Sequence, residues 1–313
     1  MLVITGATGH IGNNIVRMLL KDNIPFKVLL RKDGPELANL EIEKHIGNLL
    51  DKDFFSSHIN KGDTVIHLAG YIDLENKDYK QSYEVNYLMT KIISDVCYEK
   101  EARLVYASTT DILIKDDSGN YVIEEDISKI KHNYPKTKTM ATLYIKKMQD
   151  KGLNAIILYP TSVIGINDHK GSQAGKEIIK AANKTFLPYV KGGYDFVDVL
   201  DVSKAMIAAS FHEFSDDIIL AGSYYSIKEL YQLIGELTGK KKRLFFVPKW
   251  VAKIATRFIK GLSPMMIDIV SEAEEFNDPK LKLLLEEHIP IEITFEKVLK
   301  EANIKTNGNN KEK

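Results

Sequence analysis

The sequence has a single cysteine, Cys97, and no net charge, because 43 lysines and arginines balance 43 aspartates and glutamates. One cysteine excludes a disulfide within the chain and argues against a cysteine-based zinc site. Nucleic-acid-binding proteins usually carry a basic excess, so the balanced charge argues against that class. The eight histidines show no H-x-H or H-x-x-x-H pairing, so the sequence predicts no metal site.

Long apolar runs are also lacking, since none reaches the eighteen residues that suggest a membrane-spanning helix. The chain enters an apolar run at Leu2 with no charged leader and no cleavage site, so we expect no signal peptide. The expectation is a cytoplasmic protein that binds no nucleic acid and does not span a membrane. Apolar residues make up 44% of the 313, enough for one large α/β unit or two modest domains.

Short apolar runs alternate with longer amphipathic segments over the first two-thirds of the chain. Strands that alternate with helices give right-handed crossovers and a parallel sheet covered on both faces. The prediction is a Rossmann-type, doubly wound α/β fold whose ligand crevice lies beyond the carboxyl ends of the strands. The runs predict strands at 2–5, 26–30, near 45–46, 64–68, 103–107, 155–159 and 218–220, with helices at 11–22 and 78–99.

The last third of the chain is dominated by helical patterns, at 226–238, 249–260 and 292–302. Ser226 and Glu229 have the spacing of a capping box, which fixes the start of the first of these helices. We expect a main domain from residues 1–166, to which 194–221 return. A smaller, mainly helical substrate lobe would comprise 167–193 and 222–305, and 306–313 would be a flexible tail.

Three glycines lie between the first predicted strand and the first predicted helix, in the stretch T-G-A-T-G-H-I-G. Gly6 permits a tight turn, Gly9 lets the backbone approach a pyrophosphate, and Gly12 lets the helix pack closely on the strand. The helix N-terminus offers free N–H groups and a positive dipole end to phosphates. The main domain is therefore predicted to bind a dinucleotide, and the alternative is a glycine turn without a ligand. The cofactor-binding residues of this turn are Gly6, Thr8, Gly9, His10, Ile11 and Gly12.

The end of the second predicted strand bears on the choice of cofactor. An acidic residue at this point would bind the adenosine ribose of NAD, whereas basic residues can meet the 2′-phosphate of NADP. Arg31 and Lys32 favour NADP, and Asp33 leaves NAD open. The alternative for the two basic residues is a solvated loop.

A tyrosine and a lysine, Tyr134 and Lys138, open the helical stretch that follows the fifth predicted strand. Positions i and i+4 share one face of a helix, so both can point into the crevice. A nearby ammonium would lower the pKa of the tyrosine, which could then give or take a substrate proton. The lysine can also hold the nicotinamide ribose. The Y-x-x-x-K pattern recurs at Tyr87 and Tyr224, where we expect ordinary packing or surface roles.

The fifth predicted strand ends in three hydroxyl residues, Ser108, Thr109 and Thr110. Facing the crevice, such hydroxyls could hydrogen-bond a substrate carbonyl. The alternative is a local role, because serine and threonine often end strands through bonds to the backbone.

The glycine turn, the strand-end hydroxyls and the Tyr–Lys pair together resemble the extended short-chain dehydrogenase/reductase family, also called the NAD-dependent epimerase/dehydratase superfamily. Arg31 and the segment P-T-S-V-I-G resemble most its dihydroflavonol-reductase-like branch. The resemblance implies catalysis by Thr109, Tyr134 and Lys138 with a nicotinamide cofactor, and Ser108 is the alternative hydroxyl. It also implies a homodimer formed through two long helices.

The resemblance implies further cofactor contacts. The stretch H-L-A-G places Leu68, Ala69 and Gly70 near the adenosine half, and V-N places Asn86 on the long helix. Asn48, with Leu49, replaces the aspartate that the family usually has next to adenine. Pro160 and Val163 resemble the segment that positions the nicotinamide carboxamide. Tyr159 stands where nucleotide-sugar epimerases usually have an arginine, which argues against a sugar-nucleotide substrate.

These features predict an NADP(H)-dependent oxidoreductase that reduces a carbonyl or oxidises an alcohol of a small-molecule organic substrate. Two alternatives stay open: an epimerase or dehydratase with tightly bound NAD, and a dinucleotide-sensing regulatory protein without catalysis. The segment 250–270 mixes apolar and basic residues. It could be an interfacial helix, but Gly261 and Pro264 interrupt it, and a lid over the substrate is favoured.

Overall fold

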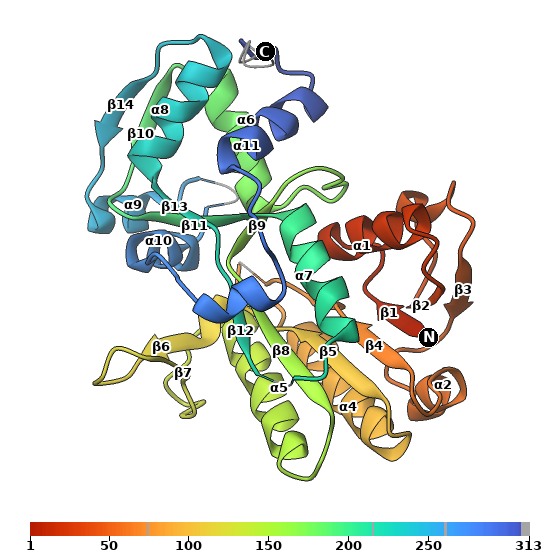
Figure 1. Cartoon of the computed structure of the whole chain (residues 1–313). Coiled ribbons are helices and arrows are strands. Elements are labelled where there is room, and N and C mark those ends of the chain that lie inside the picture. The colour runs from red at the N-terminus through yellow and green to blue at the C-terminus, as the bar shows by residue number, and fades with distance from the viewer. Residues whose placement is uncertain (74, 215, 260–261, 308–313) are drawn as a thin grey trace.

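A seven-stranded parallel sheet forms the centre of the structure, a computed structural model that describes residues 1–73, 75–214, 216–259 and 262–307 (Figure 1). The strand order is β12-β8-β5-β4-β1-β2-β3. The strands are β1 (Leu2–Thr5), β2 (Phe26–Leu30), β3 (Glu43–Ile46), β4 (Thr64–His67), β5 (Arg103–Ala107), β8 (Ala155–Pro160) and β12 (Ile218–Leu220). The predicted doubly wound α/β fold is confirmed.

The order of the strands reverses at β1, which pairs with β2 on one side and with β4 on the other. In doubly wound sheets the ligand crevice opens at this switch point, beyond the carboxyl ends of the strands. β1 ends at Thr5, directly before the glycine turn. The fold therefore places that turn at the crevice.

Helices cover both faces of the sheet (Figure 1). On one face α1 (His10–Lys21) packs beside α7 (Val199–Phe211), and their apolar side chains, such as Ile15 and Met206, form one buried cluster with the sheet. On the other face α2 (Lys52–His58), α4 (Met89–Glu99) and α5 (Asn133–Gln149) form a second cluster. Strands buried on both faces explain the continuous apolar runs of the sequence.

The helix predicted at 78–99 is divided into three segments. A short α3 (Tyr79–Ser82) leads into a π-helical segment, η2 (Tyr83–Leu88), and then into α4. π-helical turns inside α-helices are frequent at functional sites. Asn86 lies in this one.

The second lobe has its own buried cluster and more strands than the sequence predicted. A three-stranded sheet is made of β9 (Ser162–Ile164), β11 (Gly193–Asp198) and β13 (Ser223–Ser226), and β10 (Phe186–Tyr189) pairs with β14 (Arg243–Phe246). These strands are three to six residues long, too short to show a clear period in the sequence. The helices are α6 (Gln173–Asn183), α8 (Ile227–Thr238), α9 (Lys249–Ala255), α10 (Pro264–Glu272) and α11 (Ile291–Glu301).

Two helices of this lobe test the sequence interpretation directly. The capping box is confirmed, because Ser226 Oγ accepts a hydrogen bond from Glu229 N and the Glu229 carboxylate accepts one from Ser226 N. The helix predicted at 249–260 is too long, since α9 ends at Ala255 and turns follow as far as 259. Position 260 lies outside the described residues.

The chain between 194 and 221 contributes to both parts of the molecule. β12 joins the central sheet and α7 covers it, whereas β11 pairs with β9 and β13. A 3-10 turn, η4 (Pro279–Leu283), packs back onto the main cluster, and Asp278 Oδ2 accepts a 2.9 Å hydrogen bond from Ile219 N. Between β5 and α5 the chain forms an unpredicted hairpin of β6 (Leu113–Lys115) and β7 (Tyr121–Ile123). Division of the chain at the domain boundaries given above stays a prediction.

Candidate active site

The side chains of Thr109 and Tyr134 meet just beyond the carboxyl end of β5. Thr109 caps a 3-10 turn, η3 (Thr110–Ile112), and its Oγ1 accepts a 3.2 Å hydrogen bond from Asp111 N. Tyr134 lies in the first turn of α5 and is only 9% exposed. Burial and the negative charge of Asp111 raise the pKa of the Tyr134 phenol, and hydrogen bonding from the Thr109 side chain opposes this rise. The phenol therefore stays protonated and uncharged near neutral pH.

Lys138 lies one turn further along α5 but its ammonium does not act on Tyr134 as the sequence suggested. Its Nζ donates to the phenolic oxygen of Tyr106 at 2.7 Å and to the carbonyl oxygen of Ala107 at 2.6 Å. Burial lowers the pKa of Lys138 to about 7. The expectation that Lys138 lowers the pKa of Tyr134 is wrong for this arrangement, because the lysine faces the end of β5.

Ser108 and Thr109, two of the three strand-end hydroxyls, have different partners. Ser108 Oγ lies 2.8 Å from Thr142 Oγ1 of α5, and both side chains are buried. Ser108 thus joins the strand to the helix instead of facing the crevice, contrary to the expectation for all three. Thr109 is the hydroxyl that reaches Tyr134.

Asp111 is a residue of this site that the sequence interpretation missed. Asp111 is exposed at the surface, but nearby protein atoms remove part of the hydration of its carboxyl group, and this desolvation raises the pKa of the carboxyl. A hydrogen bond with the Thr109 side chain has the opposite effect and lowers that pKa. Its charge also raises the pKa values of Tyr134 and of Tyr194 on β11. A carboxylate two residues after a strand-end hydroxyl was the signal available in the sequence.

The three glycines of the turn differ in how closely neighbouring backbone atoms pack against them. A Cβ on Gly12 would lie 2.3 Å from the carbonyl oxygen of Gly6, and a Cβ on Gly6 would lie 2.6 Å from Ala69 N, so close backbone packing requires both glycines. A Cβ on Gly9 would lie 3.1 Å from its nearest neighbour, the Gly6 carbonyl oxygen. Gly9 is therefore less tightly enclosed than Gly6 and Gly12, although a Cβ there would still be crowded, and this fits a position where the backbone comes close to a phosphate.

The rim of this turn is tied to the start of the second lobe. His10 Nε2 and Asn14 Nδ2 each lie 3.0 Å from the carbonyl oxygen of Ile166, and burial lowers the pKa of His10. The predicted cofactor residue His10 therefore directs its ring to this loop. Lys170, which the sequence interpretation missed, places its Nζ 3.2 Å from Thr8 Oγ1, and its charge is suited to a pyrophosphate. No sequence signal links residues so far apart.

The two basic residues after β2 are free of ion pairs among the described residues, whereas the acidic residue next to them is paired. Asp33 is paired with Lys44 at 3.0 Å and accepts a hydrogen bond from Gly34 N. Arg31 and Lys32 are exposed, and neither forms an ion pair within the part of the chain that the structure describes. The loop lies against the glycine turn, since Asn13 Nδ2 donates to the carbonyl oxygen of Glu36 at 3.0 Å.

Other residues predicted to contact a cofactor surround the same crevice. Leu68, Ala69 and Gly70 follow β4 beside Gly6. Asn86 is buried and connects η2 to neighbouring segments: its Oδ1 accepts from Tyr71 N at 2.7 Å, and its Nδ2 donates to Thr137 Oγ1 at 3.0 Å. Asn48 Oδ1 accepts from Leu50 N, with Leu49 between them. Pro160 ends β8 and Val163 lies in β9.

Residues 2–222 match the model of the "NAD dependent epimerase/dehydratase family", and the chain belongs to that family. Over 260 residues it is 25% identical to sterol demethylase protein B of Methylococcus capsulatus, covering 81% of this chain and 79% of that protein. A dihydroflavonol 4-reductase-like protein of Synechocystis is 26% identical over 260 residues, 79% of this chain and 75% of that one. The predicted family is confirmed.

Among solved structures, the UDP-glucose 4-epimerase of Thermus thermophilus, determined with NAD, superposes with a TM-score of 0.74 at 18% identity and covers 96% of this chain and 98% of that chain. This likeness shows the fold. Within the described residues every helix is too short or too polar to cross a bilayer. The same residues contain no group of three His, Cys, Asp or Glu side chains suited to a metal ion.

Proposed function

We propose that the protein is an NADP(H)-dependent oxidoreductase that interconverts a carbonyl and an alcohol on a small organic substrate. The observation that carries the proposal is the meeting of Thr109 with Tyr134 at the end of β5, with Lys138 one turn away on the same helix. The family is described as NAD-dependent, and Gly9 is the least enclosed of the three glycines in the turn, at the point where the pyrophosphate of a dinucleotide would approach.

The cofactor would be held by the glycine turn, by Lys170 beside it, and by Arg31 and Lys32 at the adenosine end. The two unpaired cations support NADP over NAD, since a guanidinium can bind a 2′-phosphate with two hydrogen bonds. When bound, the nicotinamide supplies or accepts the hydride.

The residues of the chain would handle the substrate oxygen. Thr109 hydrogen-bonds this oxygen and orients it, and Tyr134 gives it a proton as the carbonyl is reduced. Lys138 would hold the cofactor ribose after exchanging its bonds to Tyr106 and Ala107. Tyr159 stands at the position where epimerases usually have an arginine. Its hydroxyl donates a 2.9 Å hydrogen bond to Asp217, so this side chain already has a partner within the protein. That supports a substrate other than a sugar nucleotide.

The test combines a cofactor titration with one variant. We expect tighter binding of NADPH than of NADH and net consumption of NADPH with a carbonyl substrate panel. Tyr134→Phe should lower turnover by about 10²- to 10⁴-fold and leave dinucleotide binding intact. Tyr224→Phe, from another Y-x-x-x-K pattern, is the matched control and should keep full activity.

Each other outcome has a distinct meaning. Tightly retained NAD with no net consumption during turnover would favour an epimerase or dehydratase. Dinucleotide binding without turnover of any carbonyl substrate would favour a sensing protein. Full activity of Tyr134→Phe would refute the assignment of the proton donor.

A further inference from the structure

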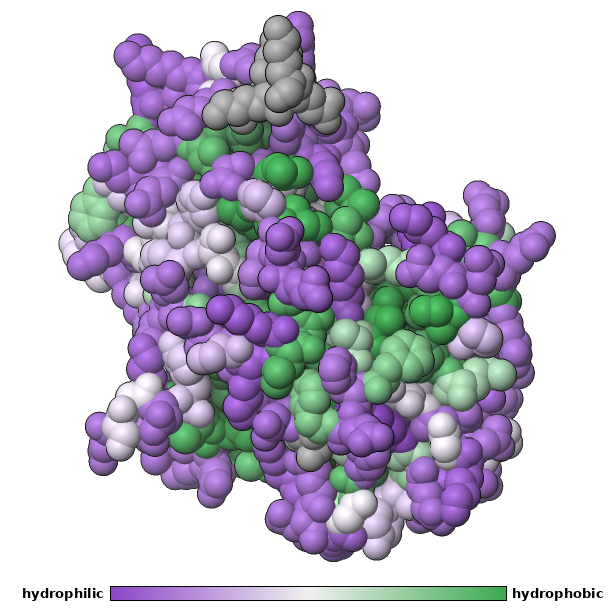
Figure 2. Space-filling view, viewed as in Figure 1, coloured by the Kyte–Doolittle hydropathy of each residue, from purple (hydrophilic) through white to green (hydrophobic). Residues whose placement is uncertain are grey.

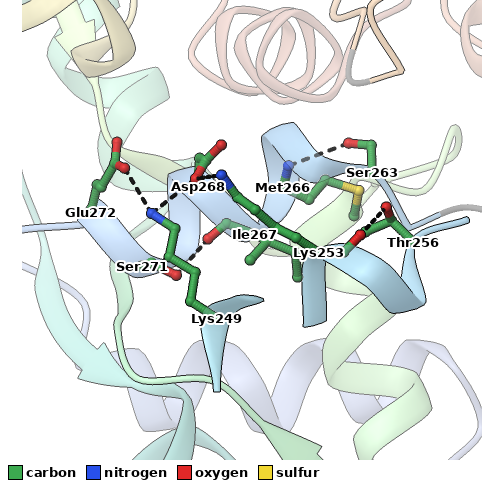
Figure 3. Close-up of polar contacts among 9 residues, drawn as sticks. All are labelled: Lys249, Lys253, Thr256, Ser263, Met266, Ile267, Asp268, Ser271 and Glu272. Carbon is green, nitrogen blue, oxygen red and sulfur yellow. Dashed lines mark hydrogen bonds and ion pairs between the residues drawn. The ribbon is translucent and has the colours of Figure 1, made fainter. Parts of the chain in front are cut away.

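Helix α9 pairs its two lysines with acidic residues of α10 and leaves its two largest apolar side chains, Trp250 and Ile254, exposed to water. Lys249 and Lys253 point toward α10 (Figure 3). Asp268 Oδ1 lies 2.9 Å from Lys249 Nζ and 2.7 Å from Lys253 Nζ, and Glu272 lies 2.8 Å from Lys249 Nζ. The polar side of α9 is therefore satisfied within the protein.

The opposite side of α9 and of the turns after it is apolar and open to water. Trp250 is 68% exposed and Phe258 is 83% exposed, with Ile254 midway between them at the same four-residue spacing. Trp250 is also the sole tryptophan of the chain. Large aromatic side chains at this level of exposure mark a surface that meets something other than water.

The exposed apolar surface continues onto the β10–β14 ribbon, which leads directly into α9. The register pairs Phe186 with Arg243 and Pro188 with Phe245, so these four residues share the outer face of the ribbon. Apolar atoms lie at the left margin of the upper lobe in Figure 2, near the end of β14. We call the combined surface the outer patch: Phe186, Phe245, Trp250, Ile254 and Phe258.

The sequence segment that carries most of the outer patch is basic. Between Leu237 and Ile267 the sequence has no aspartate or glutamate but eight basic residues, in a chain that is neutral overall. Carboxylates pair with Lys249 and Lys253, and Lys242 donates to three backbone carbonyl oxygens. Arg243 and Arg257 stay exposed beside the aromatic residues. Aromatic side chains flanked by cations are the chemistry of an anionic lipid interface.

We propose that the outer patch docks reversibly on an anionic phospholipid membrane. Trp250, Ile254 and Phe258 enter the boundary between headgroups and acyl chains, and Arg243 and Arg257 meet lipid phosphates. A second copy of the chain suits the patch less well, because a two-fold contact would set these unneutralised cations against their own counterparts. This docking does not depend on the proposed oxidoreductase activity.

The unmodified full chain already carries the reporter for the test, since Trp250 is its only tryptophan. Its fluorescence is measured with vesicles of phosphatidylcholine and with vesicles of equal parts phosphatidylcholine and phosphatidylglycerol. We expect a blue shift with the anionic vesicles that weakens as salt is raised. Absence of a shift with anionic vesicles, at low salt, would overturn the proposal.

Variants that keep Trp250 locate the contact. Phe258→Ser and Ile254→Ser should each weaken vesicle binding by about tenfold or more, because each removes a large apolar side chain from the lipid. Arg257→Gln should weaken binding to anionic vesicles and reduce its salt dependence. Phe211→Ser, at the end of α7 and 63% exposed in the native chain, is the matched control and should bind as the native protein does.

The remaining outcomes count against membrane docking. Equal loss of binding in Phe211→Ser and Phe258→Ser would show a nonspecific apolar effect. A blue shift that grows with protein concentration in the absence of vesicles, together with a dimer in sedimentation that Phe258→Ser abolishes, would assign the patch to a second copy. Circular dichroism of each variant checks that exposed substitutions leave the fold intact.

Discussion

The ammonium nitrogen of Lys138 lies 2.7 Å from the phenolic oxygen of Tyr106 and 4.1 Å from the centre of that ring. The lysine on α5 is thus anchored to β5, the strand that also presents Thr109. This contact places a cation in a buried position where burial lowers its pKa to about 7. Lys138 should therefore contribute a pH dependence to the stability of the protein.

The first prediction concerns that dependence. An unfolded lysine has a pKa of about 10.4, so above about pH 7 the unfolded chain binds a proton that the folded chain does not. The free energy of unfolding should rise with pH between these values, by up to about 1.4 kcal/mol per pH unit. In urea titrations, the free energy of unfolding of Lys138→Met should exceed that of the native protein most at low pH. This difference between the two proteins should become smaller as the pH rises. Lys61→Met, at an exposed lysine, should show a constant difference; the same slope in both variants would contradict the assignment.

The second prediction separates two neighbouring hydroxyls. Thr109→Val should lower kcat by about 10²-fold, because it removes a donor to the substrate oxygen. Ser108→Ala should keep kcat and lower the free energy of unfolding by about 1 kcal/mol through loss of the bond to Thr142. Steady-state kinetics and urea denaturation of both variants measure the two effects. A reversed pattern would identify Ser108 as the residue that acts on the substrate.

The third prediction tests the choice of cofactor. Replacing both Arg31 and Lys32 by serine should raise the Kd of NADPH by about tenfold or more, since charge-assisted hydrogen bonds to the 2′-phosphate are lost. The Kd of NADH should not change, because NADH has no phosphate at that position. Fluorescence titration of the reduced cofactors gives both constants. Lys61→Ser serves as a control for net charge, and an equal loss for both cofactors would argue against a 2′-phosphate contact.

The fourth prediction contrasts two glycines of one turn. Gly12→Ala should destabilise the fold by about 1–3 kcal/mol, because its Cβ would collide with the Gly6 carbonyl. Gly9→Ala should be destabilised less than Gly12→Ala, since Gly9 has a φ of −85° and its Cβ would lie 3.1 Å from the Gly6 carbonyl oxygen instead of 2.3 Å, and it should bind dinucleotide weakly. Thermal unfolding and cofactor titration distinguish the two. Normal cofactor affinity in a folded Gly9→Ala protein would show that the turn holds no phosphate.

The sequence was informative wherever one segment carries the whole signal. Continuous apolar runs such as 155–160 mark strands buried on both faces, and the Ser226–Glu229 spacing marks a helix start. It was least informative where a contact joins distant segments. Nothing local shows that Lys138 turns to Tyr106, that Ser108 pairs with Thr142, or that Lys170 reaches Thr8. Asp111 had a local signal, but its significance depends on the position of Tyr134.

The link between the glycine turn and Ile166 has a consequence for the order in which ligands bind. The carbonyl that His10 and Asn14 contact belongs to the chain leading from β9 into α6, at the entrance to the second lobe. A dinucleotide bound at the turn would thus fix the backbone at the entrance to the second lobe, where the proposed substrate site begins. If the protein binds a dinucleotide as proposed, we expect the dinucleotide to bind first and the substrate only afterwards.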